Sequence, residues 1–182
     1  MDELLVEFCR SGALGPLVLG ISPPDVVRRI GKPSRIKNGH GDDCYQSYRY
    51  SPVELTMRCF SRRSTIRRGA GQDLVLAAIQ IGFRGGKPLI LPEAIARRPV
   101  ASAGSLKLAD ARLLLAEHGV DMTRDHEQVL KRQLNEASVR VVSYDDGYVS
   151  QMSVGWRPSP GGWYYSEEDE AGVWVTGSPG SA

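Results

Sequence analysis

Residues 19–33 read LGISPPDVVRRIGKP, and this stretch carries the strongest structural signals in the chain. Ser22 can accept a hydrogen bond as the N-cap of a helix, and Pro23 fits the first helical position because its missing N–H needs no partner there. Gly31 suits the left-handed residue that ends a helix, and Pro33 prevents the helix from continuing. The stretch therefore predicts a helix between Ser22 and Gly31.

The segments around this helix predict a second helix and three strands. Before it, an apolar face at Leu4, Leu5 and Phe8 is typical of a short helix. After it, the run 53–60 alternates apolar and polar residues, as a strand half-buried on a core does. The region 34–43 is polar and predicts a loop. The expected elements are helices at 2–10 and 22–31 and strands at 44–50, 53–60 and 74–83.

The spacing G-x-S-x-x-x-V-x-x-x-x-G-x-P is read at Gly20, Ser22, Val26, Gly31 and Pro33. It resembles the signature of the small SmpA/OmlA (BamE-like) domains, in which a helical hairpin packs on a three-stranded antiparallel sheet. The resemblance covers roughly the first half of the chain, and it implies a domain that binds proteins and is not a catalyst. The beta-lactamase inhibitory protein carries two related units in tandem.

The second half of the chain repeats the same order of expected elements. Helices are predicted from Ser105 to Gly119 and from Asp125 through Leu134. A hairpin is predicted around the turn 145–147, with strands beginning at Val139 and at Tyr148. Because helix, helix and hairpin echo the first half, the second half is interpreted as a degenerate second unit.

The sequence thus predicts an α+β fold, with a helical hairpin packed on one face of an antiparallel β-sheet in two tandem BamE-like units. The first unit spans 1–83 and the second 105–176. Residues 84–104 are rich in Gly and Pro and predict a linker, in which 89–91 form an edge strand. Residues 163–175 predict a terminal hairpin, with a flexible tail as the alternative, and 177–182 are expected to be disordered.

Composition narrows the class of protein. The chain has 182 residues, 41% of them hydrophobic, and a net charge of +2, which argues against a nucleic-acid or membrane field over the whole molecule. No apolar run reaches the ~20 residues of a membrane span, and the acidic start is unlike an export signal. Cys9, Cys44 and Cys59 lack CxxC spacing and are expected to be reduced thiols. A cytoplasmic location is expected.

The sequence predicts no catalytic residue, cofactor or metal. His40, Asp42, Asp43 and Cys44 lie within five residues, but a GHGDD loop is more typical of a solvated turn than of converging metal ligands. A Cys44–His40 nucleophile pair has no evident orienting group. The glycines at 82, 85 and 86 do not follow a nucleotide-binding spacing, and no P-loop occurs.

Two features are candidates for binding a partner. The first is an Arg cluster in 61–73, which suits an acidic protein surface, while a solvated loop and a nucleic-acid site stay open as alternatives. The second is the group of aromatic residues near the C-terminus, since Trp, Tyr and Arg dominate interface hot spots. Together with polar positions on the strand 53–60, the predicted contact residues are Glu54, Arg58, Arg62, Arg63, Arg67, Arg68, Trp163, Tyr165 and Trp174.

The function expected from the sequence is therefore a non-catalytic cytoplasmic protein-binding module. Its sharpest version is an immunity or inhibitor protein that neutralises a bacterial toxin. One alternative is a nucleic-acid-binding or regulatory protein that uses the Arg-rich loop, although no recognition helix or interleaved aromatics accompany it. The other alternative is an uncharacterised enzyme.

Overall fold

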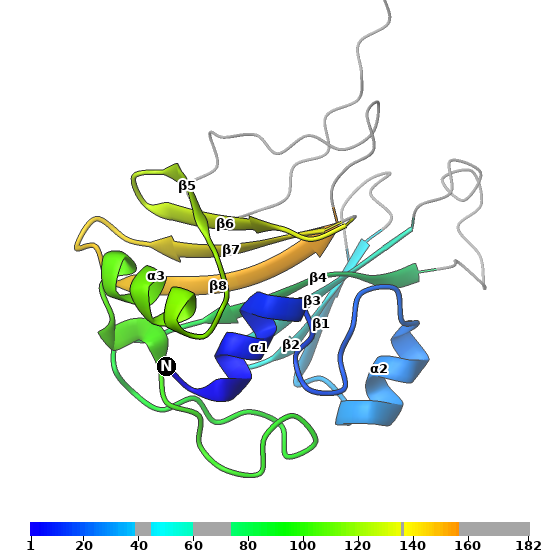
Figure 1. The fold of residues 1–182 in the computed structure, drawn as a ribbon. Helices are drawn as coiled ribbons and strands as arrows, with labels where there is room; N and C mark the ends of the chain where they lie inside the picture. Colours follow the sequence, from blue (N-terminus) through cyan, green and yellow to red (C-terminus); the bar gives the residue numbers. More distant parts are fainter. Residues whose placement is uncertain (39–44, 60–73, 136, 157–182) are drawn as a thin grey trace, which may run out of the picture.

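The computed structural model of the chain describes residues 1–38, 45–59, 74–135 and 137–156 (Figure 1). Its centre is an antiparallel sheet of eight strands in the order β1-β2-β3-β4-β8-β7-β6-β5. The strands are β1 (Arg35–Asn38), β2 (Tyr45–Tyr50), β3 (Val53–Cys59), β4 (Leu74–Gly82), β5 (Thr123–His126), β6 (Val129–Gln133), β7 (Ala137–Ser143) and β8 (Val149–Trp156). Together with the helices described next, this sheet confirms the predicted α+β class.

The sheet is built from two meanders. β1 to β4 pair consecutively, β5 to β8 pair consecutively, and the last strands of the two sets, β4 and β8, pair with each other. At that junction Ile79 lies opposite Val154, and both side chains are buried. One sheet therefore runs through both halves of the sequence.

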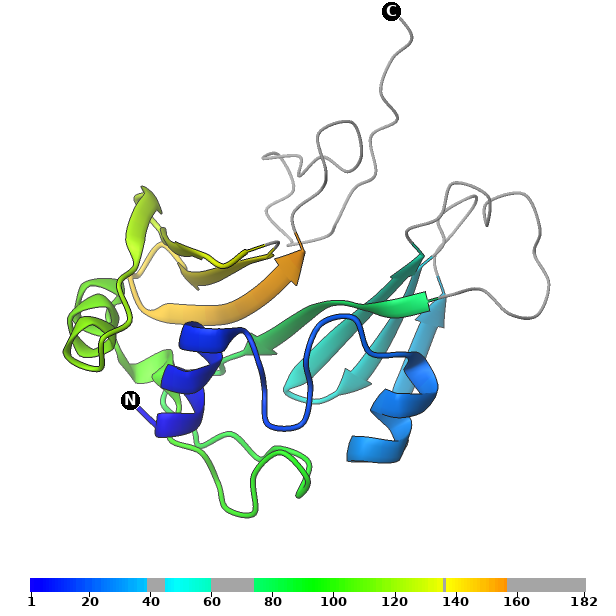
Figure 2. The same ribbon diagram turned by 45° about the vertical axis from the view of Figure 1, so that its right-hand side comes forward.

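All the described helices lie on one side of this sheet (Figure 2). They are α1 (Glu3–Ser11), α2 (Pro23–Ile30), α3 (Leu108–Glu117) and the short 3-10 helix η2 (Ala103–Ser105). In both views α1 and α2 lie apart along the sheet, with residues 12–22 between them, so the structure does not bear out the predicted packed helical hairpin. No helix of the described ranges is long and apolar enough to cross a lipid bilayer.

Local capping explains where α1 and α2 begin and end. The Asp2 carboxylate accepts a hydrogen bond from the Leu4 N–H at 3.0 Å, and the Ser22 hydroxyl accepts one from the Asp25 N–H at 3.3 Å. At the other ends, Gly12 and Gly31 have φ angles of 77° and 85°. Both helices are confirmed close to their predicted bounds because these signals are local.

Replacing Gly31 by valine is expected to lower the free energy of unfolding by about 1–2 kcal/mol. Gly31 has φ 85° and ψ −174°, a conformation that essentially only glycine adopts. A Cβ there would meet nothing within 4 Å, so the cost is backbone strain alone. Urea denaturation measures it, with the exposed neighbour substitution Lys32→Val as the control. An unchanged midpoint for Gly31→Val would contradict this geometry.

The helix predicted from Asp125 through Leu134 is wrong. The structure has the hairpin of β5 and β6 there, with Thr123 opposite Lys131 and Arg124 opposite Leu130. The reason is tertiary: β7 alternates buried and half-buried residues strictly and offers an edge with which β6 pairs along its whole length. Pairing with β7 outweighs the weak helical signal of the segment.

Two further predictions need correction. The polar loop expected at 34–43 contains β1, whose four residues are all exposed and therefore show no apolar alternation. The edge strand expected at 89–91 is absent: Leu89 makes only an isolated bridge to Val100, while Leu91 is buried. Pro88 and Pro92 flank this piece and cannot donate to a ladder.

The core lies between the helices and the sheet and draws on the whole described chain. α1 contributes Leu5, Phe8 and Cys9, each fully buried. The segment between β4 and α3 contributes Leu89, Leu91, Ile95, Val100 and Ala103. This apolar layer occupies one face of the sheet, so the other face is left to polar side chains.

Candidate functional site

The sheet face opposite the helices carries a row of polar residues that crosses every strand. In an antiparallel sheet, residues directly opposite each other share a face. The row, followed from β1 to β5, is Arg35, Arg49, Glu54, Gln80, Ser153, Arg140, Lys131 and Thr123. No described helix covers this side in either view, and we call it the open face.

The adjacent positions on the helix-covered side show the contrast. One strand position away, the row is Ile36, Tyr48, Leu55, Ile79, Val154, Val139 and Arg132. Its members from Tyr48 to Val139 are buried. The strands therefore alternate apolar inward and polar outward, as a sheet with one solvated face does.

A second row on the open face has small residues at its centre. It consists of Lys37, Ser47, Thr56, Ala78, Gly155, Ser138 and Gln133. The small side chains lie on β4, β8 and β7, and long side chains lie towards both outer strands. The middle of the face can therefore admit a partner close to the sheet.

Contacts between side chains hold several groups of the open face in place. The Gln80 Nε2 donates to the Gln151 Oε1 at 3.0 Å, which joins β4 to β8. The Ser47 hydroxyl donates to the Glu54 carboxylate. The Arg58 guanidinium lies over the Tyr45 ring, 5.8 Å from its centroid. These contacts reduce the side-chain entropy that binding would otherwise cost.

Among the described residues of the open face, bases outnumber acids. The bases are Arg35, Lys37, Arg49, Arg58, Lys131 and Arg140. The acids are Glu54 and Asp125, and the Asp125 carboxylate lies 3.5 Å from the Lys131 ammonium and 4.0 Å from the Arg140 guanidinium. The face therefore carries a net positive charge, although the whole chain is nearly neutral.

The structure places only part of the predicted contact set. Glu54 and Arg58 lie on the open-face side of β3, as expected from the alternation of that strand, and Arg58 is buried there, with 8% of its surface exposed. The other predicted residues lie outside the described ranges: Arg62, Arg63, Arg67, Arg68, Trp163, Tyr165 and Trp174. The Arg-rich segment joins Cys59 to Leu74, which pair at the end of the sheet where β8 also stops.

Sequence reasoning missed most of the basic residues of the open face. Arg35 and Lys37 were assigned to a loop, and Lys131 to a helix. The position of Arg140 on the polar side could be predicted, because it alternates with the buried Val139 and Val141 on a predicted strand. Since the face of each strand depends on its pairing, the residues of one row come together only in the folded sheet.

The structure gives no support for a metal centre in the described ranges. No group of three or more His, Cys, Asp or Glu residues gathers there. The sequence cluster of His40, Asp42, Asp43 and Cys44 lies outside them.

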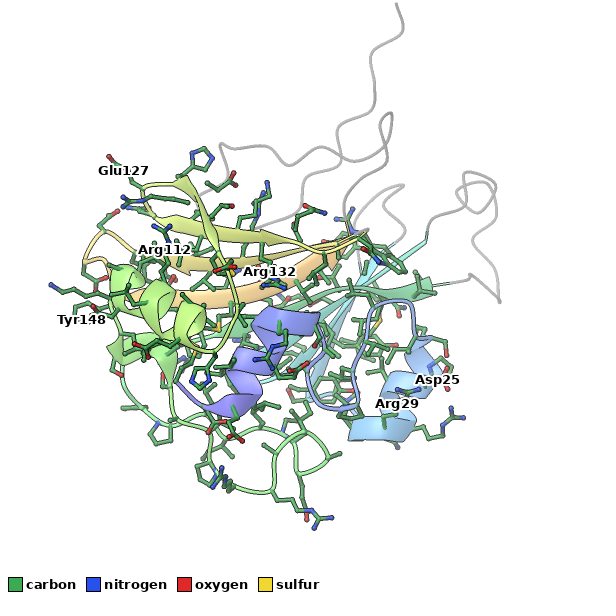
Figure 3. All side chains as sticks on the ribbon, in the orientation of Figure 1. Asp25, Arg29, Arg112, Glu127, Arg132 and Tyr148 are labelled. Carbon is green, nitrogen blue, oxygen red and sulfur yellow. The ribbon has the colours of Figure 1, made fainter. Side chains whose placement is uncertain are left out.

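Cys9 is the cysteine whose side chain the structure describes, so we consider whether its thiol could act as a nucleophile. It is fully buried on α1, with its Sγ 3.9 Å from the Met152 Sδ. Burial raises the pKa of the thiol to about 12, although the positive charge of Arg132 acts in the opposite direction. In Figure 3 the labelled Arg132 lies between β6 and α1. The Cys9 thiol is therefore neutral at ordinary pH and serves as part of the core.

Cys9 is expected to be unreactive towards a disulfide reagent in the native protein and to react fully after unfolding. The test uses a Cys44→Ser, Cys59→Ser background, so that the released chromophore reports Cys9 alone. Because burial raises the pKa of the native thiol, the unfolded state ionises first as pH rises, and this ionisation favours unfolding. The free energy of unfolding should therefore fall as pH rises above about 9, the unfolded thiol's range. Rapid native labelling at pH 8 would contradict the burial of Cys9.

Comparison with known proteins yields little similarity. No protein-family model and no curated protein matches the chain. Among solved structures, the chain is similar to a DUF4309 family protein (YjgB) from Bacillus subtilis subsp. subtilis str. 168, with a TM-score of 0.47 and 12% sequence identity, over 85% of this chain and 95% of that one.

Proposed function

We propose that the chain is a non-catalytic protein-binding module and that it binds its partner with the open face of the sheet. The observation that carries the proposal is the polar row from Arg35 to Thr123, which crosses all eight strands on the side that the described helices leave uncovered. A sheet face that only needed to be solvated would not require basic residues to outnumber acidic ones.

The open face has the size of an ordinary protein interface. Eight strands spaced about 4.8 Å apart span about 34 Å, and the central strands run about 25 Å. Each partner in a standard complex buries about 800 Å². The area of the face is of that order, and its ordered amide, hydroxyl and guanidinium groups suit a polar contact.

The outer edges of the sheet favour binding by the face over the addition of a strand. β1 carries Arg35 and Lys37, and β5 carries Arg124 and Asp125, all on short strands of four residues. Charged side chains on short edge strands discourage pairing with another chain. A partner with an acidic surface therefore fits the open face best, because it also matches its charge.

The finer role draws on the arrangement of the two halves of the chain. Each half of the chain contributes one four-stranded meander, and the last strands of the meanders pair, which agrees with the interpretation as two tandem units. The resemblance to SmpA/OmlA (BamE-like) domains favours protein binding over catalysis. A cytoplasmic immunity or inhibitor protein remains the sharpest version of the proposal.

Nucleic-acid binding is the competing function, since a basic face also attracts phosphates. The described open face has Tyr45 as its aromatic residue, already under Arg58, so it offers no stacking platform. Titration of the purified chain with duplex and single-stranded DNA at about 0.15 M salt is expected to show no saturable binding. Saturable binding that weakens steeply with salt would overturn the protein-binding proposal.

The experiment that tests the proposal places a photo-cross-linking amino acid at Gln80, at the centre of the open face. A matched chain carries it at Leu113, which is 65% exposed on α3. Irradiated in a lysate of the native organism, the Gln80 chain is expected to capture a protein that the Leu113 chain does not. The captured protein must then bind the unmodified chain when both are purified. Capture by Leu113 alone, or no binding between the purified proteins, would refute the proposal.

A further inference from the structure

The chain itself contains a segment of the charge and composition that the open face would bind. Residues 157–182 hold Glu167, Glu168, Asp169 and Glu170, while the sole basic residue in this range is Arg157. Trp163, Tyr164 and Tyr165 precede these acids and Trp174 follows them. An acidic stretch between aromatic residues complements a basic face with small residues at its centre.

We propose that the segment from Trp163 to Trp174 binds the open face of its own sheet and competes there with the partner. Its acids would meet the bases on either side of the row, above all Arg49 on β2 and Lys131 on β6. Its aromatic residues would lie over the small centre formed by Ala78, Ser153 and Gly155.

The point at which the described chain ends makes this binding geometrically feasible. β8 is a central strand, and it stops at Trp156 between β4 and β7. Ser153 is three residues back, or about 10 Å along the strand. Lys131 lies two strands from β8 on one side, which is about 10 Å across the sheet. Arg49 lies three strands from β8 on the other side, which is about 14 Å. The ten residues that separate Trp156 from Glu167 can span about 33 Å.

Covalent linkage strengthens such a contact. A short linker gives the attached segment an effective concentration of the order of millimolar, so weak charge pairing and a few aromatic contacts suffice. The two acids of the face offset part of its attraction, because Glu54 lies opposite Arg49 and Asp125 lies 3.5 Å from Lys131. Six bases against two acids still leave the described face positive. A partner would have to displace the segment. The apparent affinity of the partner would therefore fall in proportion to the fraction of chains in which the open face is free.

The test uses the full-length purified chain with a photo-cross-linking residue at Ser153. After irradiation, the monomeric band is digested and the linked peptides are identified by mass spectrometry. The expected product links position 153 to a peptide from 163–174. The same residue at Leu113, on the helix side, should give no such product. A second probe at Thr56 on the open face guards against a folding defect at Ser153, and circular dichroism checks each chain.

Charge dependence completes the test. Converting the four acids to Gln and Asn should lower the cross-link yield about fivefold, and Arg49→Gln on the face should also lower it, whereas Arg112→Gln on α3 should not. No product with 163–174 from either open-face probe, equal yield from Leu113, or products only in a dimeric band would overturn the inference. A cross-link yield that stays the same after the four acids are neutralised would also overturn it.

The inference shares its face with the proposed function but fails separately from it. The cross-link needs only the purified chain, whereas the proposed function needs a partner captured at Gln80. If the inference holds, neutralising the four acids should tighten partner binding. If it fails while the partner still binds at Gln80, only the competition by the segment is refuted.

Discussion

Ile79→Ala is expected to lower the free energy of unfolding by about 3–4 kcal/mol, within the range measured for large-to-small changes in cores. Ile79 is fully buried in β4, opposite Leu55 on β3 and Val154 on β8. Its side chain therefore lies where the two meanders join. Urea denaturation followed by circular dichroism measures the loss.

The same experiment tests whether the two halves share one core. Because the buried cluster is continuous across the β4–β8 junction, circular dichroism and tryptophan fluorescence should report a single coincident transition, both for the wild type and for Ile79→Ala. Leu113→Ala, on an exposed site of α3, should change stability by no more than about 0.5 kcal/mol. Two separated transitions, of which Ile79→Ala shifts only one, would contradict a shared core.

Gly104→Ala is expected to cost about 3 kcal/mol or to prevent folding at elevated temperature. A Cβ at Gly104 would lie 2.3 Å from the Gly85 carbonyl oxygen and 2.9 Å from the Phe83 Cβ. The oxygen belongs to the backbone, and the Ser102 hydroxyl donates to it at 2.9 Å, so the neighbour cannot move aside cheaply. Thermal unfolding measures the effect.

Gly82→Ala is the matched control for Gly104→Ala. At Gly82 the nearest heavy atom to a Cβ would be the Pro52 carbonyl oxygen, 3.9 Å away, and φ is not positive. This change is expected to be neutral or to stabilise slightly, because alanine restricts the unfolded chain. Equal melting temperatures for the two variants would show that η2 does not pack against Gly85 as described.

The parts of the fold that sequence reasoning predicted are those with local causes. Ser22 and Gly31 bracket α2 through contacts within the helix itself, and the alternation of Val53, Leu55 and Met57 depends only on one strand. The segments that it missed depend on distant partners. β1 is exposed along its length and is ordered by pairing with β2, while β6 is ordered by pairing with β7.

The candidate site was only partly predictable for the same reason. Glu54 and Arg58 were identified because their own strand shows which side is polar. Arg49 joins them through the pairing of β2 with β3, where it lies opposite Glu54. Lys131 joins them only through the antiparallel pairing of β4 with β8, which no local signal encodes. The positive charge of the open face is hidden in a chain whose net charge is +2.

The measurement that tests the central claim most directly is the dissociation constant of the captured partner for chains with altered charge on the open face. Gln80→Glu with Ser153→Glu adds two acids at the centre of the row, and Leu113→Glu with Ala116→Glu adds two on exposed sites of α3. Both pairs are made in the background with neutral residues at 167–170, so that the chain's own acids play no part.

Calorimetric titration is expected to give a dissociation constant about tenfold or more higher for the open-face pair, which corresponds to about 1.4 kcal/mol of binding free energy. The pair on α3 should leave the constant unchanged. Equal constants for the two pairs, or weaker binding only for the pair on α3, would contradict binding by the open face of the sheet.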